Sequence, residues 1–97
     1  MDAQNKMPDD NPVRIPIDGV LDLHAFRAEE VKTLVPEYLE ECRKLGIYQV
    51  RIIHGKGTGA LRRTVQSLLR KNPDVLQFKT ADLGGGGWGA TEVMLKK

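Results

Sequence analysis

Short apolar runs alternate with two amphipathic segments along this chain of 97 residues, and that alternation most restricts its fold. Apolar residues that alternate or cluster over five or six positions favour strands, whereas apolar residues three and four positions apart favour helices. The resulting order of elements is β-α-β-α-β-β. The predicted strands span 20–24, 50–53, 75–80 and 90–95, and the predicted helices span 29–46 and 59–71.

This order predicts a four-stranded mixed sheet with both helices on one face, which is a two-layer α/β sandwich. The first two strands should be parallel, because a strand–helix–strand unit crosses over, in the right-handed sense, and starts its second strand at the same end as the first. Residues 17–97 would form this single domain. Residues 1–16 include three prolines and show no periodicity, so we expect a flexible N-terminal arm.

The two last strands are expected to alternate cleanly. In the third strand, Val75, Gln77 and Lys79 should share one face, and Leu76, Phe78 and Thr80 the other. In the closing strand, Thr91, Val93 and Leu95 should share one face.

The first helix has a single apolar stripe that includes Cys42, so we interpret this lone cysteine as a packing residue. Pro36 lies off the stripe and lacks an N–H, which predicts a kink or a restart of the helix there. One cysteine cannot form an internal disulfide, which favours a reducing, cytoplasmic environment. The apolar runs are too short to span a membrane, and no export signal opens the chain.

Charge is distributed unevenly, although the net charge is only +2. Residues 42–73 contain eight basic side chains and no acidic one, whereas residues 18–41 contain seven acidic and two basic ones. A basic middle segment of this kind indicates an anionic partner, or else a solvated helix face.

Two histidines follow the first two predicted strands, and they are the candidate catalytic residues. His24 ends the run 20–24 and His54 follows 50–53. The carboxyl ends of parallel strands lie at one edge of a sheet, so we expect the two imidazoles to be close. Asp22 is two residues before His24 on the same predicted strand face and could orient its ring.

Glycine-rich segments follow both His54 and the third strand. Residues 55–59 place three glycines, Lys56 and Thr58 just before a helix, where free backbone N–H groups and the helix dipole favour anions. The candidate nucleic-acid-binding residues are Gly55, Lys56, Gly57, Thr58, Gly59, Arg62, Arg63 and Trp88. Trp88, in the glycine loop 84–89, could stack on a base or cover the core.

Three strings in this chain, at residues 21–24, 53–59 and 86–91, together resemble the marks of the Smr (small MutS-related) domain family. These marks are L-D-L-H-G, H-G-K-G-x-G and G-G-x-G-[AV]-T. The resemblance covers residues 17–97 and implies a stand-alone member with the same β-α-β-α-β-β sandwich. It also implies function at Asp22, His24, His54, Gly55, Lys56 and Gly57. One departure is Ala25, where the family usually has glycine.

The resemblance implies nucleic-acid binding and, for many members, endonuclease activity in repair, recombination or RNA surveillance. One histidine would act as general base and the other as general acid, while Lys56 and the turn amides would stabilise phosphoryl charge. With RNA, the 2′-hydroxyl could attack without a metal, which is the easier chemistry. With DNA, an activated water and a divalent ion such as Mg²⁺ become more plausible, and Asp22 is the candidate carboxylate.

Two alternatives to an endonuclease remain open. A non-catalytic module would grip phosphates of structured DNA or RNA through the basic segment. A protein-interaction domain would instead dock on a ribosome or repair complex. We expect a cytoplasmic monomer without membrane contact, because the apolar stripes do not demand a partner. No residue is assigned as a metal ligand.

Overall fold

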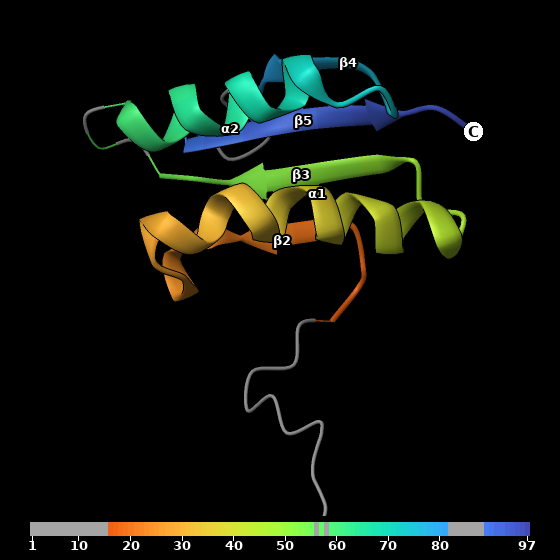
Figure 1. The fold of residues 1–97 in the computed structure, drawn as a ribbon, viewed down its shortest axis with the longest axis horizontal. Coiled ribbons are helices and arrows are strands. Elements are labelled where there is room, and N and C mark those ends of the chain that lie inside the picture. Colours follow the sequence, from red (N-terminus) through yellow and green to blue (C-terminus); the bar gives the residue numbers. More distant parts are fainter. Residues whose placement is uncertain (1–15, 56, 58, 82–88) are drawn as a thin grey trace, which may run out of the picture.

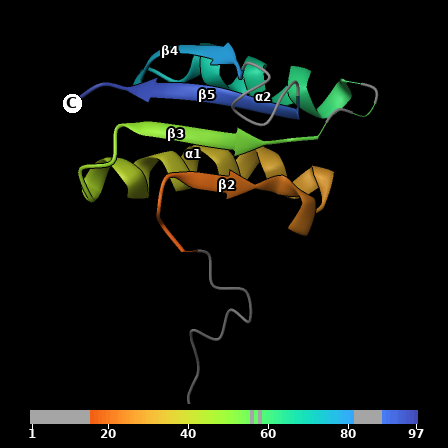
Figure 2. The same cartoon turned by 180° about the vertical axis from the view of Figure 1, so that it is seen from behind.

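The computed structural model describes residues 16–55, 57, 59–81 and 89–97. These residues form a four-stranded sheet in the order β2-β3-β5-β4, with β2 parallel to β3 and the other neighbours antiparallel. Helices α1 and α2 both lie on one face of this sheet, and no described helix covers the other face (Figures 1 and 2). The predicted two-layer sandwich is therefore confirmed. In chain order the elements are β2 (Val20–Asp22), the 3₁₀ helix η2 (Leu23–Ala25), α1 (Ala28–Lys44), β3 (Gln49–Ile53), α2 (Ala60–Lys71), β4 (Val75–Thr80) and β5 (Ala90–Leu95).

The core lies between the sheet and the two helices. The stripe of α1 is buried, and it includes Cys42, as predicted for a packing residue. The central strands β3 and β5 form the opposite side of the core. Each of them has a neighbouring strand on both sides. The fully or almost fully buried apolar side chains are Leu21, Leu23, Val31, Val35, Tyr38, Leu39, Cys42, Val50, Ile52, Val65, Leu69, Val93 and Leu95.

Helix α1 is continuous from Ala28 to Lys44, so the predicted restart at Pro36 is wrong. Pro36 is exposed and has no N–H to donate to the carbonyl of Lys32. Lys32 lies on the same exposed side of the helix. Water can satisfy that carbonyl, which explains why the helix tolerates the proline in its interior.

Strand β4 departs from the predicted alternation. Its pairing with β5 shifts register between Val75 and Gln77, which leaves Leu76 as an extra residue in a bulge. Val75 and Phe78 therefore both pack against the core, whereas Leu76 is exposed. The prediction that Leu76 and Phe78 share a face is wrong for this reason. In β5 the predicted alternation is confirmed, because Thr91, Val93 and Leu95 are all buried.

The first strand is shorter than predicted and ends at Asp22, where the chain turns into η2. Leu23 is buried and His24 is exposed, so the turn still separates an inward from an outward side chain. Ala25 closes this right-handed 3₁₀ turn, and alanine adopts that conformation readily. The replacement of the family glycine by Ala25 therefore creates no backbone conflict here.

Candidate nucleic-acid site

Asp22 and His24 form an exposed pair at the end of β2. The Asp22 carboxylate Oδ1 accepts hydrogen bonds from the His24 backbone N–H at 2.9 Å and from His24 Nδ1 at 2.7 Å. The prediction placed these residues on one strand face, but their contact comes from Asp22 acting as the N-cap of η2. The hydrogen bond from the His24 backbone, more than that from its ring, lowers the pKa of Asp22 below 3.8, so the carboxylate is ionised at neutral pH.

Asp22 contacts Nδ1 of His24, and no other described residue is hydrogen-bonded to its Nε2. The His24 side chain is 66% exposed, so a ligand in solvent can reach the ring. A carboxylate on Nδ1 keeps the proton there and makes Nε2 the proton acceptor in the neutral ring. His24 is therefore oriented and accessible.

His54 is at the same edge but in a different environment. Its side chain is buried, with only 6% of the residue exposed. Nδ1 lies 3.0 Å from the carbonyl oxygen of Gly55, and Nε2 lies 2.8 Å from Thr91 Oγ1. A carbonyl oxygen can only accept, so we assign the proton to Nδ1, and the Thr91 hydroxyl then donates to Nε2. Burial, with a smaller contribution from the charge of Arg62, lowers the pKa of His54 below 6.5.

Gly55 connects the two histidines. Its carbonyl accepts from His54, and a Cβ atom built on Gly55 would lie 3.0 Å from His24 Nε2. Gly55 also has a φ of +81°, a conformation that favours glycine. The absence of a side chain at residue 55 thus allows the His24 ring to pack against the backbone that His54 holds. The two imidazoles share one edge, as the parallel strands predicted.

The glycine turn leads from this edge into α2. Gly59 is the N-cap of α2 with a φ of +86°, and the guanidinium groups of Arg62 and Arg63 lie close to it. Figure 1 shows η2 and the beginning of α2 at the same end of the molecule. A cleft of about 350 Å³ opens here, lined by Ala28, His54, Gly55, Gly57, Gly59, Ala60, Leu61, Arg62 and Thr64.

Three predicted site residues, Lys56, Thr58 and Trp88, lie outside the described residues, as do residues 1–15 of the predicted arm. The other predicted residues lie along the edge just described. Sequence reasoning did not identify Thr91 as the partner of His54, nor Gln66 as the partner of Thr91. The Gln66 side-chain amide donates to Thr91 Oγ1 at 3.2 Å, and Thr91 is completely buried. Thr91 stood within the third family-like string, whereas no sequence signal distinguishes Gln66.

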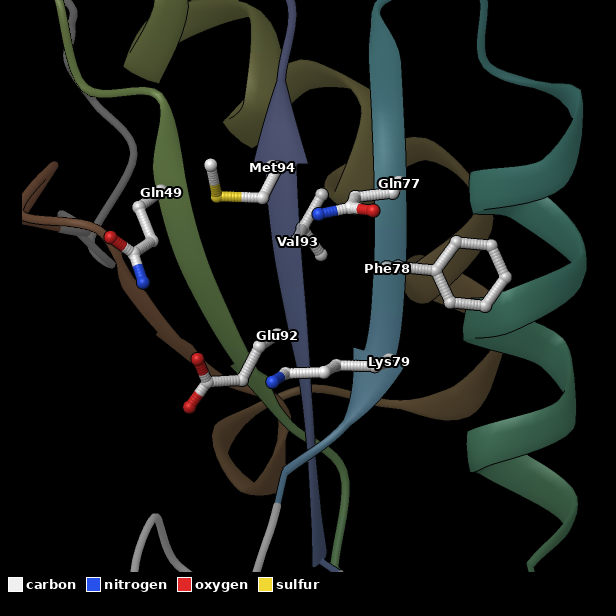
Figure 3. Close-up of a pocket in the computed structure, with 7 residues that line it drawn as sticks. All are labelled: Gln49, Gln77, Phe78, Lys79, Glu92, Val93 and Met94. Atoms are coloured by element: carbon white, nitrogen blue, oxygen red, sulfur yellow. The ribbon is translucent and has the colours of Figure 1, made fainter.

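A second hollow, of about 220 Å³, lies on the face of the sheet that no described helix covers (Figure 3). It is lined by Gln49, Gln77, Phe78, Lys79, Glu92, Val93 and Met94. The figure shows the Phe78 ring directed toward α2 and the polar groups of Lys79 and Glu92 over the strands. One cation and one anion give this hollow no preference for an anionic ligand, and it contains none of the predicted site residues.

Within the described part of the chain, no three His, Cys, Asp or Glu side chains gather in a way that could hold a metal ion. At the histidine edge the Oδ1 atom of Asp22 already accepts two hydrogen bonds. The described residues therefore do not form a metal site. None of the described helices is long and apolar enough to cross a membrane.

Fold and site together define a small α/β domain with an oriented histidine beside a glycine turn and a basic helix end. Comparison with known proteins agrees with this class. A family model described as the Smr domain matches residues 21–96. Endonuclease MutS2 of Clostridium botulinum (strain 657 / Type Ba4) is 39% identical over 80 residues, which are 82% of this chain and 10% of that protein. Endonuclease MutS2 of Bacillus thuringiensis (strain Al Hakam) is 46% identical over 76 residues, which are 78% of this chain and 10% of that protein.

Two solved structures are also similar. The Smr domain of Thermus thermophilus MutS2 superimposes with a TM-score of 0.77 at 40% identity, covering 82% of this chain and all of that one. YdaL, a stand-alone small MutS-related protein from Escherichia coli, has a TM-score of 0.69 at 32% identity, covering 81% of this chain and 65% of YdaL. This chain belongs to the Smr domain family. It spans about a tenth of the MutS2 proteins that it matches.

Proposed function

We propose that this domain is an endonuclease that cleaves phosphodiester bonds in structured nucleic acid, with His24 as the group that transfers the proton. The observation that supports it is the Asp22–His24 pair, which presents an oriented and exposed imidazole ring beside a glycine turn. The names of the MutS2 relatives, which describe endonucleases, support the same class of reaction.

The hydrogen bonds of His54 favour a positioning role over the acid–base role that the sequence predicted. Both of its ring nitrogens are used inside the protein, and its lowered pKa favours the neutral ring at neutral pH. A general acid must present a proton to the leaving group within hydrogen-bond reach. His54 instead holds the carbonyl of Gly55, and through it the backbone against which His24 packs.

On RNA the proposed reaction balances without a further reactant. His24 Nε2 takes the proton from the 2′-hydroxyl, and the 2′ oxygen attacks the adjacent phosphorus. The bond from phosphorus to the 5′ oxygen breaks, the leaving oxygen takes a proton from solvent, and a 2′,3′-cyclic phosphate remains. The backbone N–H groups of the glycine turn, Lys56 and the Arg62 and Arg63 guanidiniums would stabilise charge on the phosphoryl oxygens.

Replacing His24 should separate catalysis from binding. We expect His24→Ala to cleave a labelled structured RNA roughly 10²–10⁴-fold more slowly, which is the usual contribution of general acid–base catalysis. Its affinity for the same RNA should change little, because the glycine turn and the arginines remain. The measurements are single-turnover cleavage rates and gel-shift affinities of both proteins, each with and without EDTA.

The product ends and a DNA control complete this experiment. A 2′,3′-cyclic phosphate on the RNA product would support attack by the 2′-hydroxyl. A structured DNA of the same shape tests whether a water can replace that hydroxyl, and the EDTA arm tests whether a divalent ion takes part. A His24→Ala protein that cleaves as fast as the parent would remove the proposal.

A structure-specific binding module without catalysis is the second candidate. One observation favours it: both ring nitrogens of His54 are hydrogen-bonded within the protein, which leaves the leaving group without a histidine acid among the described residues. Strong gel shifts with an intact substrate under all conditions would establish this alternative in place of the endonuclease.

A further inference from the structure

A groove runs between α1 and α2 on the helical face of the domain. Its volume is about 450 Å³, and it is lined by Lys32, Ala60, Arg63, Thr64, Ser67, Leu68 and Lys71. It shares Ala60 and Thr64 with the cleft at the glycine turn, so the two hollows adjoin at the beginning of α2. Figure 1 shows the two helices side by side on this face.

The charges in this groove all have one sign. Lys32 comes from α1 and Arg63 and Lys71 from α2, and no acidic side chain lines the groove. Elsewhere Arg27, Arg43, Lys44 and Arg51 each form an ion pair with a carboxylate. The three cations of the groove have no carboxylate partner among the residues that the structure describes. They are exposed, so an anion can approach them.

The spacing along α2 fits an extended ligand. Arg63, Ser67 and Lys71 are each four residues apart and therefore form one row along the helix. At 1.5 Å per residue the row is about 12 Å long. The row therefore spans the axial rise of about three to four nucleotide steps of one duplex strand, at about 3.4 Å for each step. The hydroxyls of Thr64 and Ser67 can donate to phosphate oxygens between the cations.

We infer that this groove between α1 and α2 binds the sugar–phosphate backbone of the nucleic acid. The part bound in the groove lies next to the nucleotide at the histidine edge. This inference rests on the proposed function, because the strand in the groove would belong to the same nucleic acid that the histidine edge binds. Contacts of this type are to phosphates and sugars, so they position the substrate without reading its sequence. The groove makes the length of the flanking strand a determinant of affinity.

A double variant tests the groove separately from the glycine turn. Lys32→Ala with Lys71→Ala removes two charges that belong to the groove and not to the cleft beside His54. The matched control, Lys79→Ala with Lys96→Ala, removes the same charge from exposed side chains outside the groove. All four residues are exposed, so we expect thermal unfolding to show that both double variants fold as the parent does.

The readout is the slope of log affinity against log salt concentration for a labelled structured RNA. Each lost phosphate contact should reduce the magnitude of this slope by about one. The slope of the groove variant should therefore fall in magnitude by about two, and that of the control should hardly change. At 0.1 M salt we expect a loss of affinity on the order of tenfold for each lysine. Shortening the flanking strand should weaken the parent but change the groove variant little.

The outcomes are distinguishable. If the parent binds RNA and the groove variant keeps its slope, or if the control loses as much as the groove variant, the groove inference is overturned while the proposed function stands. If the parent binds neither RNA nor DNA, the proposed function itself fails. Binding of an acidic peptide through the groove, in place of nucleic acid, would also overturn the inference.

Discussion

The imidazoles of His24 and His54 have different contacts because their surroundings differ. His24 is held by a carboxylate and faces solvent, whereas His54 is enclosed and bonded at both nitrogens. Sequence position alone placed both at strand ends and made them look equivalent. The partner of each ring decides which nitrogen carries a proton and whether a substrate can reach the other one.

The hydrogen-bond chain from Gln66 through Thr91 to His54 is tested by changing Thr91. Thr91→Val keeps the shape but leaves His54 Nε2 and the Gln66 amide without this partner, so we expect a loss of about 1–3 kcal/mol in the free energy of unfolding. We expect kcat to fall more than KM rises, because the glycine turn loses its support. Thr91→Ser should restore both.

The measurements are urea unfolding, steady-state cleavage, and the nitrogen chemical shifts of the His54 ring, which report its tautomer. A purely structural role would lower stability without changing the His54 tautomer or kcat in the folded protein. Finding unchanged ring shifts in Thr91→Val would contradict the assignment of Thr91 as the donor to Nε2.

At the scale of elements, helix α1 holds the strand that ends at the Asp22–His24 pair. Tyr38 of α1 is buried, and its hydroxyl accepts from the N–H of Gly19 and donates to the carbonyl of Val20, both at 3.1 Å. These bonds fix the beginning of β2, an edge strand of only three residues. Short strands with one neighbour depend on such contacts for their position.

Tyr38→Phe should therefore weaken the attachment of β2 to α1. Removing the hydroxyl leaves the Gly19 N–H without its partner, and we expect a cost of about 1–3 kcal/mol in the free energy of unfolding. Chemical denaturation measures the cost, and amide hydrogen exchange locates it. We expect faster exchange at the beginning of β2 than in α2, and equal acceleration in both elements would argue against a local role for Tyr38.

At the scale of the whole molecule, burial of His54 makes stability depend on pH. Its pKa lies below 6.5 in the folded protein, so the unfolded chain takes up a proton at a higher pH than the folded one does. The contribution of His54 is thus complete above about pH 6.5 and is lost as the pH falls below that value. One proton limits the slope to about 1.4 kcal/mol per pH unit.

Unfolding free energies measured between pH 5 and 8 check this dependence. The parent should lose stability on acidification through this range, and His54→Gln, which does not titrate, should show a flatter profile. A His54→Gln profile as steep as that of the parent would show that another group is responsible.

Local sequence patterns determined the elements of this fold. Apolar stripes spaced by three and four residues defined α1 and α2, and the alternating runs defined β4 and β5 with the bounds that the structure has. These patterns are local because a helix or strand must bury one face. The parallel pairing of β2 with β3, and hence the meeting of His24 and His54 at one edge, followed from the helical crossover, which returns the chain to the end where β2 begins.

Only the tertiary structure decided what the site residues do. The contact of Asp22 with His24 depends on a 3₁₀ turn, the bulge at Leu76 depends on pairing with β5, and the enclosure of His54 depends on Thr91, which is 37 residues away in the chain. Burial and hydrogen bonding across such distances are set by packing, and no local pattern encodes them. The sequence by itself determined which groups could act, whereas packing decided that His24 is open to a ligand and that His54 is not.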